Sequence, residues 1–438
     1  MKPSIAVVIC NYNKVAYLKG CLNSLWPAKK TWPAMKVFVV DNASTDGSQD
    51  MIRQHYGEWV ELIALTENTG GSGGFARGMQ AAMASDCEYT ALLDNDILLD
   101  VDTLSLLVDY LQQHDRVGVA GAKICTMDNP QKLQELGAFI DWEHYGVRTP
   151  LKGHDDSDSL PEVVNCDYVP ACCLVTRTRI IEDIGTFDEA HFIYWDDMDW
   201  CTRVKQAGYE IHAIRKARVR HKMGAVNATN TFSNYYFERN RLRFFAKYLS
   251  AEKFNNLIQV RLKELPRQAF LSAKKGQSSQ PLSCHLALYD FAMQNWFAQP
   301  DNIFTKSPYQ WWDGIKTDQV KAIVCANPES FTAVLSSLSE VLGEREVIGW
   351  ESYLALGKPE ECIHLVEHVL EATKVPSGYL VDRFFNVCKA SELKHLKQAF
   401  EAYSSIFNSI HAPVLAKQLQ AGFAELRASF ACDTKGRV

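Results

Sequence analysis

Residues 66–80, TENTGGSGGFARGMQ, place four glycines within five consecutive positions. The segment follows an apolar run at residues 62–65 and leads into a helix-forming run at residues 79–84. Glycines ahead of a helix usually mark a backbone that approaches another group closely. The motif Gly71-x-Gly73-x-x-Ala76, with Asp94 downstream, loosely fits the fingerprint of dinucleotide-binding folds. The strands around the segment decide whether that interpretation holds.

The first hundred residues alternate short apolar runs with helical patterns. Strands are predicted at residues 5–10, 36–40, 62–65 and 90–93, and each is followed at once by polar or glycine-rich residues. Continuous apolarity of this kind indicates strands that are buried on both faces. The β-α-β-α-β-α-β order predicts an α/β fold with a mostly parallel sheet, in which ligands lie beyond the carboxyl ends of the strands.

The position of the glycine segment argues against a nicotinamide-dependent oxidoreductase. The dinucleotide fingerprint belongs in the first strand-to-helix turn, here residues 11–14, whereas the glycines follow the third strand. Asp94 instead belongs to the triplet Asp94-Asn95-Asp96, where the fourth strand ends. Two carboxylates spaced by one residue at such a point can both reach one hard cation. A similar triplet, Asp156-Ser157-Asp158, lies in a polar loop that no strand delivers to a sheet edge, so it is a poorer candidate.

Length and composition limit the class of protein. A chain of 438 residues with 47% hydrophobic and 22% charged content is expected to form at least two domains. The first apolar run is too short for a signal sequence, and no run approaches the roughly 20 apolar residues that span a bilayer. We therefore expect a cytoplasmic protein. The thirteen cysteines form no C-x-x-C pair, so a zinc site and a disulfide framework are both disfavoured.

A basic segment stands out in this acidic chain. Residues 215–275 carry fifteen basic and three acidic residues, although the net charge of the chain is −6. Apolar residues between 232 and 249 recur at helical spacing, and Arg239, Arg241, Arg243 and Lys247 lie among them. This pattern predicts an amphipathic helix whose basic side would hold the protein at an anionic membrane surface. Packing of the same helix on the first domain is the alternative.

Six ordered motifs resemble the inverting family 2 glycosyltransferases of GT-A fold, over roughly residues 4–250. The motifs are VVICNYN, VVDNASTDGS, ENTGGSGGFARG, LLDNDI, PACCLVTRTRIIEDIGTFDE and FIYWDDMDWCTRVKQAGY. Within that family, the glycine segment, the string Trp-Asp-Asp-x-Asp and YYFERNRLRFF are most similar to bacterial galactofuranosyltransferases and, next, to rhamnosyltransferases. The resemblance implies a GT-A, Rossmann-like catalytic domain with a mostly parallel sheet.

The resemblance also implies a metal site and a catalytic base. Transfer from a nucleoside diphosphate sugar needs a cation to neutralise the leaving diphosphate and a base for the attacking hydroxyl. Asp94, Asp96 and His221 are the implied ligands of Mn²⁺ or Mg²⁺, although a partly buried surface histidine is the plainer interpretation of His221. Asp197 is the implied base. Trp195, Asp196 and Asp199 are the implied acceptor-binding residues. For Trp195 plain packing is an equal alternative, and the acids could instead cap a helix.

The same resemblance assigns residues to the donor nucleotide sugar, for which a UDP-sugar is expected. Asp41 resembles the carboxylate that reads the nucleotide base. The other expected donor-binding residues are Asn11, Asn13, Asn68, Gly71, Gly74 and Arg77, together with Asp94. Arg77 is favoured because a guanidinium suits phosphate oxygens. A glycine in this segment could equally serve only the turn.

The rest of the chain is predicted as a separate domain. We place a GT-A domain at residues 1–250 and a mainly α-helical C-terminal domain, for assembly or membrane attachment, at residues 251–438. Helical patterns are found at residues 362–370 and 393–410, and a strand is predicted at residues 321–326.

The function that follows is a metal-dependent inverting transfer of a sugar, with UDP-galactofuranose as the first donor candidate and dTDP-rhamnose as the second. The acceptor would be a growing surface polysaccharide or a polyprenyl-diphosphate-linked glycan. We expect a location on the inner face of the plasma membrane, self-association into a homo-oligomer and no nucleic-acid partner. A non-catalytic scaffold subunit is the alternative of a different class. The presence of Asp94, Asp96, Asp197 and His221 favours an enzyme.

Overall fold

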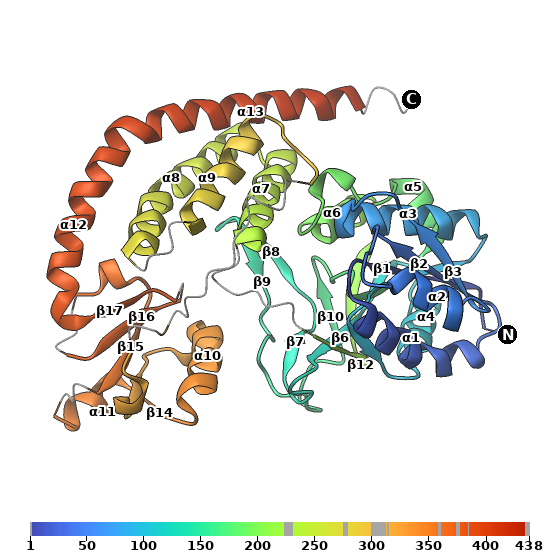
Figure 1. Cartoon of the computed structure of the whole chain (residues 1–438), viewed down its shortest axis with the longest axis horizontal. Helices are drawn as coiled ribbons and strands as arrows, with labels where there is room; N and C mark the ends of the chain where they lie inside the picture. Colours follow the sequence, from blue (N-terminus) through green and yellow to red (C-terminus); the bar gives the residue numbers. More distant parts are fainter. Residues whose placement is uncertain are drawn as a thin grey trace. The chain divides into compact units, whose positions relative to one another are not determined.

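A computed structural model describes residues 2–222, 231–274, 279–298, 312, 315–357, 361–373, 377–383 and 385–433 (Figure 1). The chain divides into two compact units. Unit 1 comprises Met1–Ala225, Asn240–Phe245 and Asn295–Gln299, and unit 2 comprises Val226–Arg239, Ala246–Gln294 and Pro300–Val438. Helix α7, Thr231–Tyr248, contributes residues to both units. The domain boundary near residue 250 therefore stays a prediction.

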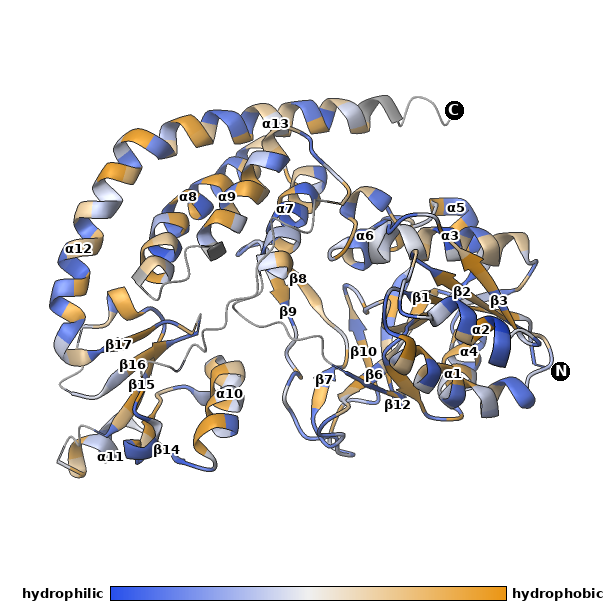
Figure 2. Cartoon of the chain, viewed as in Figure 1, coloured by the Kyte–Doolittle hydropathy of each residue, from blue (hydrophilic) through white to orange (hydrophobic). Residues whose placement is uncertain are grey.

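Unit 1 contains a ten-stranded sheet whose parallel half confirms the predicted strands. This half has the order β4-β1-β2-β3, formed by Tyr89–Asp94, Ile5–Asn11, Met35–Asp41 and Val60–Ala64. Asn11 lies opposite Asp41, and Cys10 lies opposite Asp94, so the carboxyl ends of these strands share one edge. The crossovers run through α1 (Val15–Lys30), α2 (Ser48–His55) and α3 (Gly70–Ala84). Figure 2 shows hydrophobic residues concentrated in the strands of this sheet.

The other half of the sheet is mixed. Beyond β4 the order is β11-β6-β12-β10, formed by Cys173–Arg177, Val117–Thr126, Glu210–His221 and Val163–Cys166. The short strands β5 (Ile97–Leu99) and β7 (Leu133–Glu135) pair with β12 and β6, and β8 (Phe139–Asp141) forms a hairpin with β9 (Gly146–Arg148). The helices of this half are α4 (Thr103–Gln113), α5 (Thr178–Ile184), the 3₁₀ helix η1 (Glu189–His191) and α6 (Asp196–Gln206).

The glycines of the opening segment lie inside helix α3, which begins at Gly70. A Cβ on Gly70 would lie 2.0 Å from the carbonyl oxygen of Phe192, and one on Gly74 would lie 2.3 Å from Cys10 Sγ. A Cβ on Gly78 would lie 2.0 Å from Val8 Cγ1. What these glycines approach closely is therefore the protein itself. Their small size lets α3 pack directly on β1 and on the turn that leads into α6.

We expect Gly78→Ala to destabilise unit 1 by about 1–3 kcal/mol, because the added methyl group must displace the packed side chain of Val8. Gly71→Ala is a matched control in the same helix, since a Cβ there would meet nothing within 4 Å. Alanine favours helix over glycine by up to about 1 kcal/mol, so this control should be neutral or slightly stabilising. Thermal unfolding of both variants checks the prediction, and equal midpoints would contradict it.

Unit 2 is mainly helical, as predicted, but it also contains a sheet. Its long helices are α8 (Ala251–Lys274), α9 (Ser279–Ala292), α10 (Thr332–Leu342), α12 (Leu393–Ile406) and α13 (Ala412–Asp433). The sheet has the order β14-β13-β15-β16-β17, formed by Glu346–Ile348, Ala322–Val324, Cys362–Val366, Tyr379–Asp382 and Val387–Lys389. Strand β13 confirms the strand predicted at residues 321–326.

The helix predicted at residues 362–370 is wrong. These residues form β15 and the 3₁₀ turn η5, Val369–Glu371. A short apolar run fits a buried strand as well as a buried helix, and periodicity alone cannot separate the two. Here β15 is the central strand of its sheet, paired in parallel with both β13 and β16.

Two of the four basic side chains of the predicted interfacial helix, those of Arg239 and Arg243, are buried in the protein. In unit 2, Arg239 is fully buried and lies over the ring of Tyr236. In unit 1, Arg243 pairs with Asp188 at 2.7 Å, and Phe244 is fully buried. Arg241 and Lys247 are only partly buried, so binding of α7 to an anionic membrane surface stays a prediction. Among the described residues, no helix is long and apolar enough to cross a membrane.

Candidate active site

Two aspartates and a histidine meet at the carboxyl edge of the unit 1 sheet. Asp94 is the last residue of β4, Asp96 lies in the turn before β5, and His221 ends β12. Strand β12 pairs with β5 so that His221 lies opposite Ile97, which carries the histidine to the acidic turn. His221 Nε2 lies 3.1 Å from Asp96 Oδ1 and 3.9 Å from Asp94 Oδ2. The three residues predicted as metal ligands are therefore neighbours.

The groups around this cluster fix its orientation and charge. His221 Nδ1 lies 2.8 Å from Gln134 Oε1, an acceptor, so Nδ1 carries a proton and Nε2 faces the carboxylates. Lys14 Nζ lies 2.6 Å from Asp96 Oδ2. Burial opposes the ionised form of Asp96, but its hydrogen bond with His221 and the charges of His221 and Lys14 outweigh this, and its pKa is lowered. Asp96 is thus an ionised oxygen donor.

The pKa values of Asp94 and His221 are both raised within this cluster. Burial and the neighbouring Asp96 raise the pKa of Asp94 to about 6. Burial works against the charged form of His221, but the hydrogen bond with Asp96 and the charge of Asp94 raise its pKa. Carboxylate oxygens and one imidazole nitrogen form a donor set that fits Mn²⁺ or Mg²⁺. A bound divalent cation would take the place of the protons that the cluster now holds.

A turn with unusual backbone geometry leads into the second acidic cluster. Phe192, Tyr194 and Trp195 have positive φ angles of 65°, 67° and 69°. Such conformations cost energy in non-glycine residues, and they occur preferentially at functional sites. Asn240 Nδ2 stabilises the turn by donating to the carbonyl oxygens of His191 and Ile193, each at 2.7 Å. The turn ends at Asp196, the first residue of α6.

The backbone links Asp197 to the metal-ligand cluster, which comprises the predicted ligands Asp94, Asp96 and His221. Its Oδ1 accepts from the N–H of Met198 at 2.8 Å, and its Oδ2 accepts from the N–H of Ala171 at 3.4 Å. The next residue, Cys172, accepts a hydrogen bond through its carbonyl oxygen from the N–H of Asp94 at 3.1 Å. Two hydrogen bonds to neighbouring residues thereby link acidic residues that lie about a hundred positions apart in the sequence.

Burial gives two carboxyls of this region unusual proton affinity. Burial and the adjacent Asp196 raise the pKa of Asp197 to about 8. Burial and the nearby Asp197 raise the pKa of Glu135, on β7, also to about 8. Glu135 Oε1 has no hydrogen-bond partner in the described part of the chain. A carboxylate with a raised pKa is a better proton acceptor near neutral pH, as a general base requires.

The residues predicted to bind the acceptor have structural partners. Asp196 is buried, and its Oδ2 accepts from Ser72 Oγ at 2.7 Å. Asp199 is fully buried and pairs with Arg203 at 3.1 Å, so it anchors α6. Trp195 is fully buried, and its ring lies 5.1 Å from that of Phe244. For Trp195 the packing alternative therefore describes the structure, because a fully buried ring offers no face to a sugar.

Three predicted donor-binding residues order the loop after β2. Asp41 is fully buried and accepts from Asn11 Nδ2 at 2.9 Å, Ser44 N at 2.9 Å and Gln49 Nε2 at 2.8 Å. Asn13 Oδ1 accepts a backbone N–H of the same loop at 2.8 Å. Recognition of a nucleotide base through Asp41 stays a prediction.

The remaining donor-binding candidates lie on or before α3. Asn68 Oδ1 accepts from the N–H of Gly70 at 2.9 Å and so begins the helix. The space beside Gly74 is filled by packed protein atoms, whereas the space beside Gly71 is open and leaves room for a ligand. Arg77 is exposed and donates to Gln80 Oε1 at 2.8 Å. Contacts of Asn68 and Arg77 with a donor stay predictions.

Several residues of the site escaped sequence reasoning. Lys14 directly follows the predicted donor residues after β1, so its position was a usable signal. Gln134 and Glu135 come from the three-residue strand β7, for which no periodicity is visible. Ser72 and Cys172 stand in quoted motifs, but only the folded chain places them beside Asp196 and Asp94. The triplet Asp156-Ser157-Asp158, called the comparison triplet below, differs from Asp94-Asn95-Asp96. Its two acids pair with the basic residues Lys123 and Arg215.

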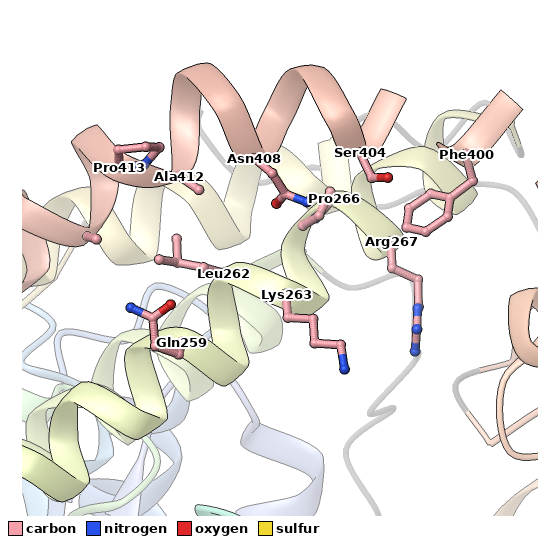
Figure 3. Close-up of a pocket in the computed structure, with 11 residues that line it drawn as sticks. Gln259, Leu262, Lys263, Pro266, Arg267, Phe400, Ser404, Asn408, Ala412 and Pro413 are labelled. Carbon is pink, nitrogen blue, oxygen red and sulfur yellow. The ribbon is translucent and has the colours of Figure 1, made fainter. Parts of the chain in front are cut away.

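A groove among the described residues lies elsewhere, in unit 2 between α8 and the helices α12 and α13. Figure 3 shows Lys263, Arg267, Phe400 and Asn408 among the side chains that line its volume of about 520 Å³. No carboxylate, histidine or cysteine is among its lining residues. It therefore lacks the groups that metal binding or proton transfer needs, and the acidic edge of unit 1 remains the candidate active site.

The parallel half of the unit 1 sheet thus ends in paired aspartates near a histidine, and a second acidic cluster begins α6. Residues 6–182 match the family described as Glycosyl transferase family 2. The chain therefore carries a family 2 glycosyltransferase domain.

The relatives are distant. An uncharacterized glycosyltransferase of Nostoc sp. is 25% identical over 235 residues, which are 52% of this chain and 69% of that protein. The galactofuranosyltransferase GlfT2 of Mycobacterium tuberculosis is 24% identical over 263 residues, which are 54% of this chain and 39% of GlfT2. Rhamnosyltransferases are also among the relatives. A mannosyltransferase of Pyrobaculum calidifontis, solved with GDP-Man and Mn²⁺, aligns with a TM-score of 0.42 and 16% identity over 67% of this chain and 76% of that chain.

Proposed function

We propose that unit 1 transfers a sugar from a nucleoside diphosphate sugar to a glycan hydroxyl with inversion at the anomeric carbon. One observation supports the proposal: hydrogen bonds at the neighbouring residues Ala171 and Cys172 link the Asp197 carboxylate to the backbone of Asp94. An inverting transfer needs a base near the anomeric carbon and counter-charge near the leaving diphosphate, and these two clusters supply both.

Asp94, Asp96 and His221 would hold Mn²⁺ or Mg²⁺, which neutralises the charge that develops on the leaving diphosphate. Gln134 keeps the Nε2 of His221 directed at that position. Lys14, now paired with Asp96, is close enough to contribute a further positive charge to the phosphates. These residues bind and orient the donor.

Asp197 would remove the proton from the attacking hydroxyl. The N–H groups of Met198 and Ala171 fix its two oxygens, and its raised pKa makes it a competent base. Asp196, held by Ser72, keeps negative charge close to Asp197 and so raises its proton affinity. The positive-φ turn before α6 fixes the position of both acids.

The proposed donor is UDP-galactofuranose, and the alternative is dTDP-rhamnose. Support comes from the motifs of the galactofuranosyl branch and from GlfT2 and the rhamnosyltransferases among the relatives. The proposed acceptor is a growing cell-surface polysaccharide or a polyprenyl-diphosphate-linked glycan. One relative is named an N-acetylglucosaminyl-diphospho-decaprenol rhamnosyltransferase, which fits an acceptor of that chemistry. Attachment to the inner face of the plasma membrane would follow from a lipid-linked acceptor.

A panel of UDP- and dTDP-sugars tests this proposal. The purified protein is incubated with each donor and with Mn²⁺ or Mg²⁺, and release of the free nucleoside diphosphate is measured with and without a lipid-linked acceptor. Metal-dependent release from one donor, stimulated by the acceptor, is the expected result. Metal-dependent binding of UDP or dTDP without release from any donor would instead favour a non-catalytic scaffold.

A further inference from the structure

Cys172 places a thiol at the metal-ligand cluster. Strand β11 runs antiparallel to β4 with Cys173 opposite Leu93, so the preceding Cys172 comes to lie beside Asp94. In the described part of the chain, the thiol of the adjacent Cys173 is not among the atoms that gather with those of Asp94 and His221. One ligand atom each of Asp94, Cys172 and His221 all lie within 4.8 Å of one another. The thiol is therefore part of the cluster.

We propose that Cys172 Sγ is a fourth donor at this centre, which lets the centre bind thiophilic divalent cations such as Zn²⁺ and Co²⁺ in competition with Mn²⁺ and Mg²⁺. The proposal rests on the metal centre of the proposed function. Asp94, His221 and the thiolate offer one oxygen, one nitrogen and one sulfur within 4.8 Å of one another, and an Asp96 oxygen lies 3.1 Å from His221 Nε2. Tetrahedral zinc takes such sets, with Zn–S near about 2.3 Å and Zn–N near about 2.0 Å.

The geometry requires only small changes at the side chains. A sulfur and a nitrogen bound to one tetrahedral zinc lie roughly 3.5 Å apart, as the bond lengths for zinc imply. The ligand atoms of Asp94, Cys172 and His221 lie within 4.8 Å of one another in the structure. Rotation of the side chains can close the difference between this distance and the distance in a zinc complex. Binding would release the thiol proton of Cys172 and the Nε2 proton of His221 to solvent, so the Zn–S and Zn–N bonds replace two bonds to hydrogen.

The donor chemistry separates the cations. Mg²⁺ and Mn²⁺ favour oxygen and imidazole donors and gain little from sulfur, whereas Zn²⁺ and Co²⁺ gain strongly from thiolate. Zn²⁺ affinity should therefore depend on Cys172, and Mn²⁺ affinity should depend mainly on the aspartates and the histidine. In a cell, Zn²⁺ would compete with the productive cation at this centre.

Cobalt spectroscopy tests the proposal, because a thiolate bound to Co²⁺ gives a charge-transfer band in the near ultraviolet. Wild type should show this band on titration with Co²⁺, and Cys172→Ser and Cys172→Ala should lose it. Cys173→Ser is the matched control, since it removes the adjacent buried thiol and should keep the band. Calorimetry should show Zn²⁺ affinity falling by more than about tenfold in Cys172→Ser, with a smaller change for Mn²⁺.

Each outcome has a defined meaning. Co²⁺ binding to wild type without the thiolate band, abolished by Asp96→Ala, overturns the role of Cys172 and leaves the metal centre in place. A band retained in both Cys172 variants also overturns it. Absence of any Co²⁺, Zn²⁺ or Mn²⁺ binding to wild type contradicts the metal centre of the proposed function as well. Unfolding midpoints of all variants identify any that fail to fold.

Discussion

Asp197→Asn is expected to lower kcat for sugar transfer by about 10²–10⁴-fold, the usual contribution of a general base. The substitution keeps the shape of the side chain and its carbonyl acceptor for the N–H of Met198, but it removes the proton-accepting oxygen. The proposed metal ligands Asp94 and Asp96 are untouched, so donor affinity should change by no more than a few-fold. Steady-state kinetics with the active donor and calorimetry with its nucleotide measure the two quantities.

The pH dependence of the same reaction gives an independent check. Burial and Asp196 raise the pKa of Asp197 to about 8, so the base is protonated and inactive at low pH. In wild type, kcat/KM should therefore rise close to tenfold per pH unit between pH 6 and 7 and level off near pH 8. Asp197→Asn should lack this rise. Asp158→Asn, an exposed aspartate of the comparison triplet, should keep it. Turnover of Asp197→Asn near the wild-type value would show that another group is the base.

The parallel half of the sheet could be predicted from sequence because three of its four strands, β1, β2 and β4, are largely buried on both faces. Continuous apolar runs such as residues 5–10 leave little choice of structure, and the polar residues that follow each run mark the ligand-binding edge. The mixed half was harder to predict, since the short strands β5 and β7 carry no periodic signal. These two strands nevertheless position His221, through Ile97 and through Gln134.

The roles of individual residues were less predictable than their elements. A glycine shows that something lies close to the backbone, but not whether that neighbour is a ligand or a protein group. At Gly70, Gly74 and Gly78 the neighbour is the protein. The basic residues of α7 raise the same difficulty, because their helical spacing does not reveal that Asp188 pairs with Arg243. A sequence pattern gives the face on which a side chain lies, whereas its partner comes from the tertiary fold.

The acidic residues show the same difference between what a sequence pattern predicts and what the tertiary fold decides. Asp94 and Asp96 follow a strand whose end was predictable, and both lie at the metal-ligand cluster. Asp196, Asp197 and Asp199 share one motif yet differ in environment, since Asp196 binds Ser72, Asp197 accepts backbone N–H groups, and Asp199 pairs with Arg203. Only tertiary contacts assign different tasks to three acids within four positions.

Asp96→Ala is expected to remove metal-dependent binding of the nucleotide and, with it, nearly all transfer activity. Asp96 is the ionised member of the cluster, and its two oxygens contact His221 Nε2 and Lys14 Nζ. Its loss removes one cation ligand and leaves Lys14 without its buried partner, so the positive charge of the lysine would oppose a divalent cation at the same place. Chelation with EDTA should likewise stop transfer by wild type, and added Mn²⁺ or Mg²⁺ should restore it.

Calorimetry of UDP binding with and without Mn²⁺ separates this loss from a general loss of structure. Wild type should bind UDP more tightly in the presence of the metal, and Asp96→Ala and His221→Ala should show little or no such gain. Asp158→Ala serves as the control, because it alters the comparison triplet at an exposed side chain and should keep the full gain. If both cluster variants keep the wild-type gain, Asp96 and His221 are not metal ligands, and the counter-charge for the diphosphate must come from protein cations such as Lys14.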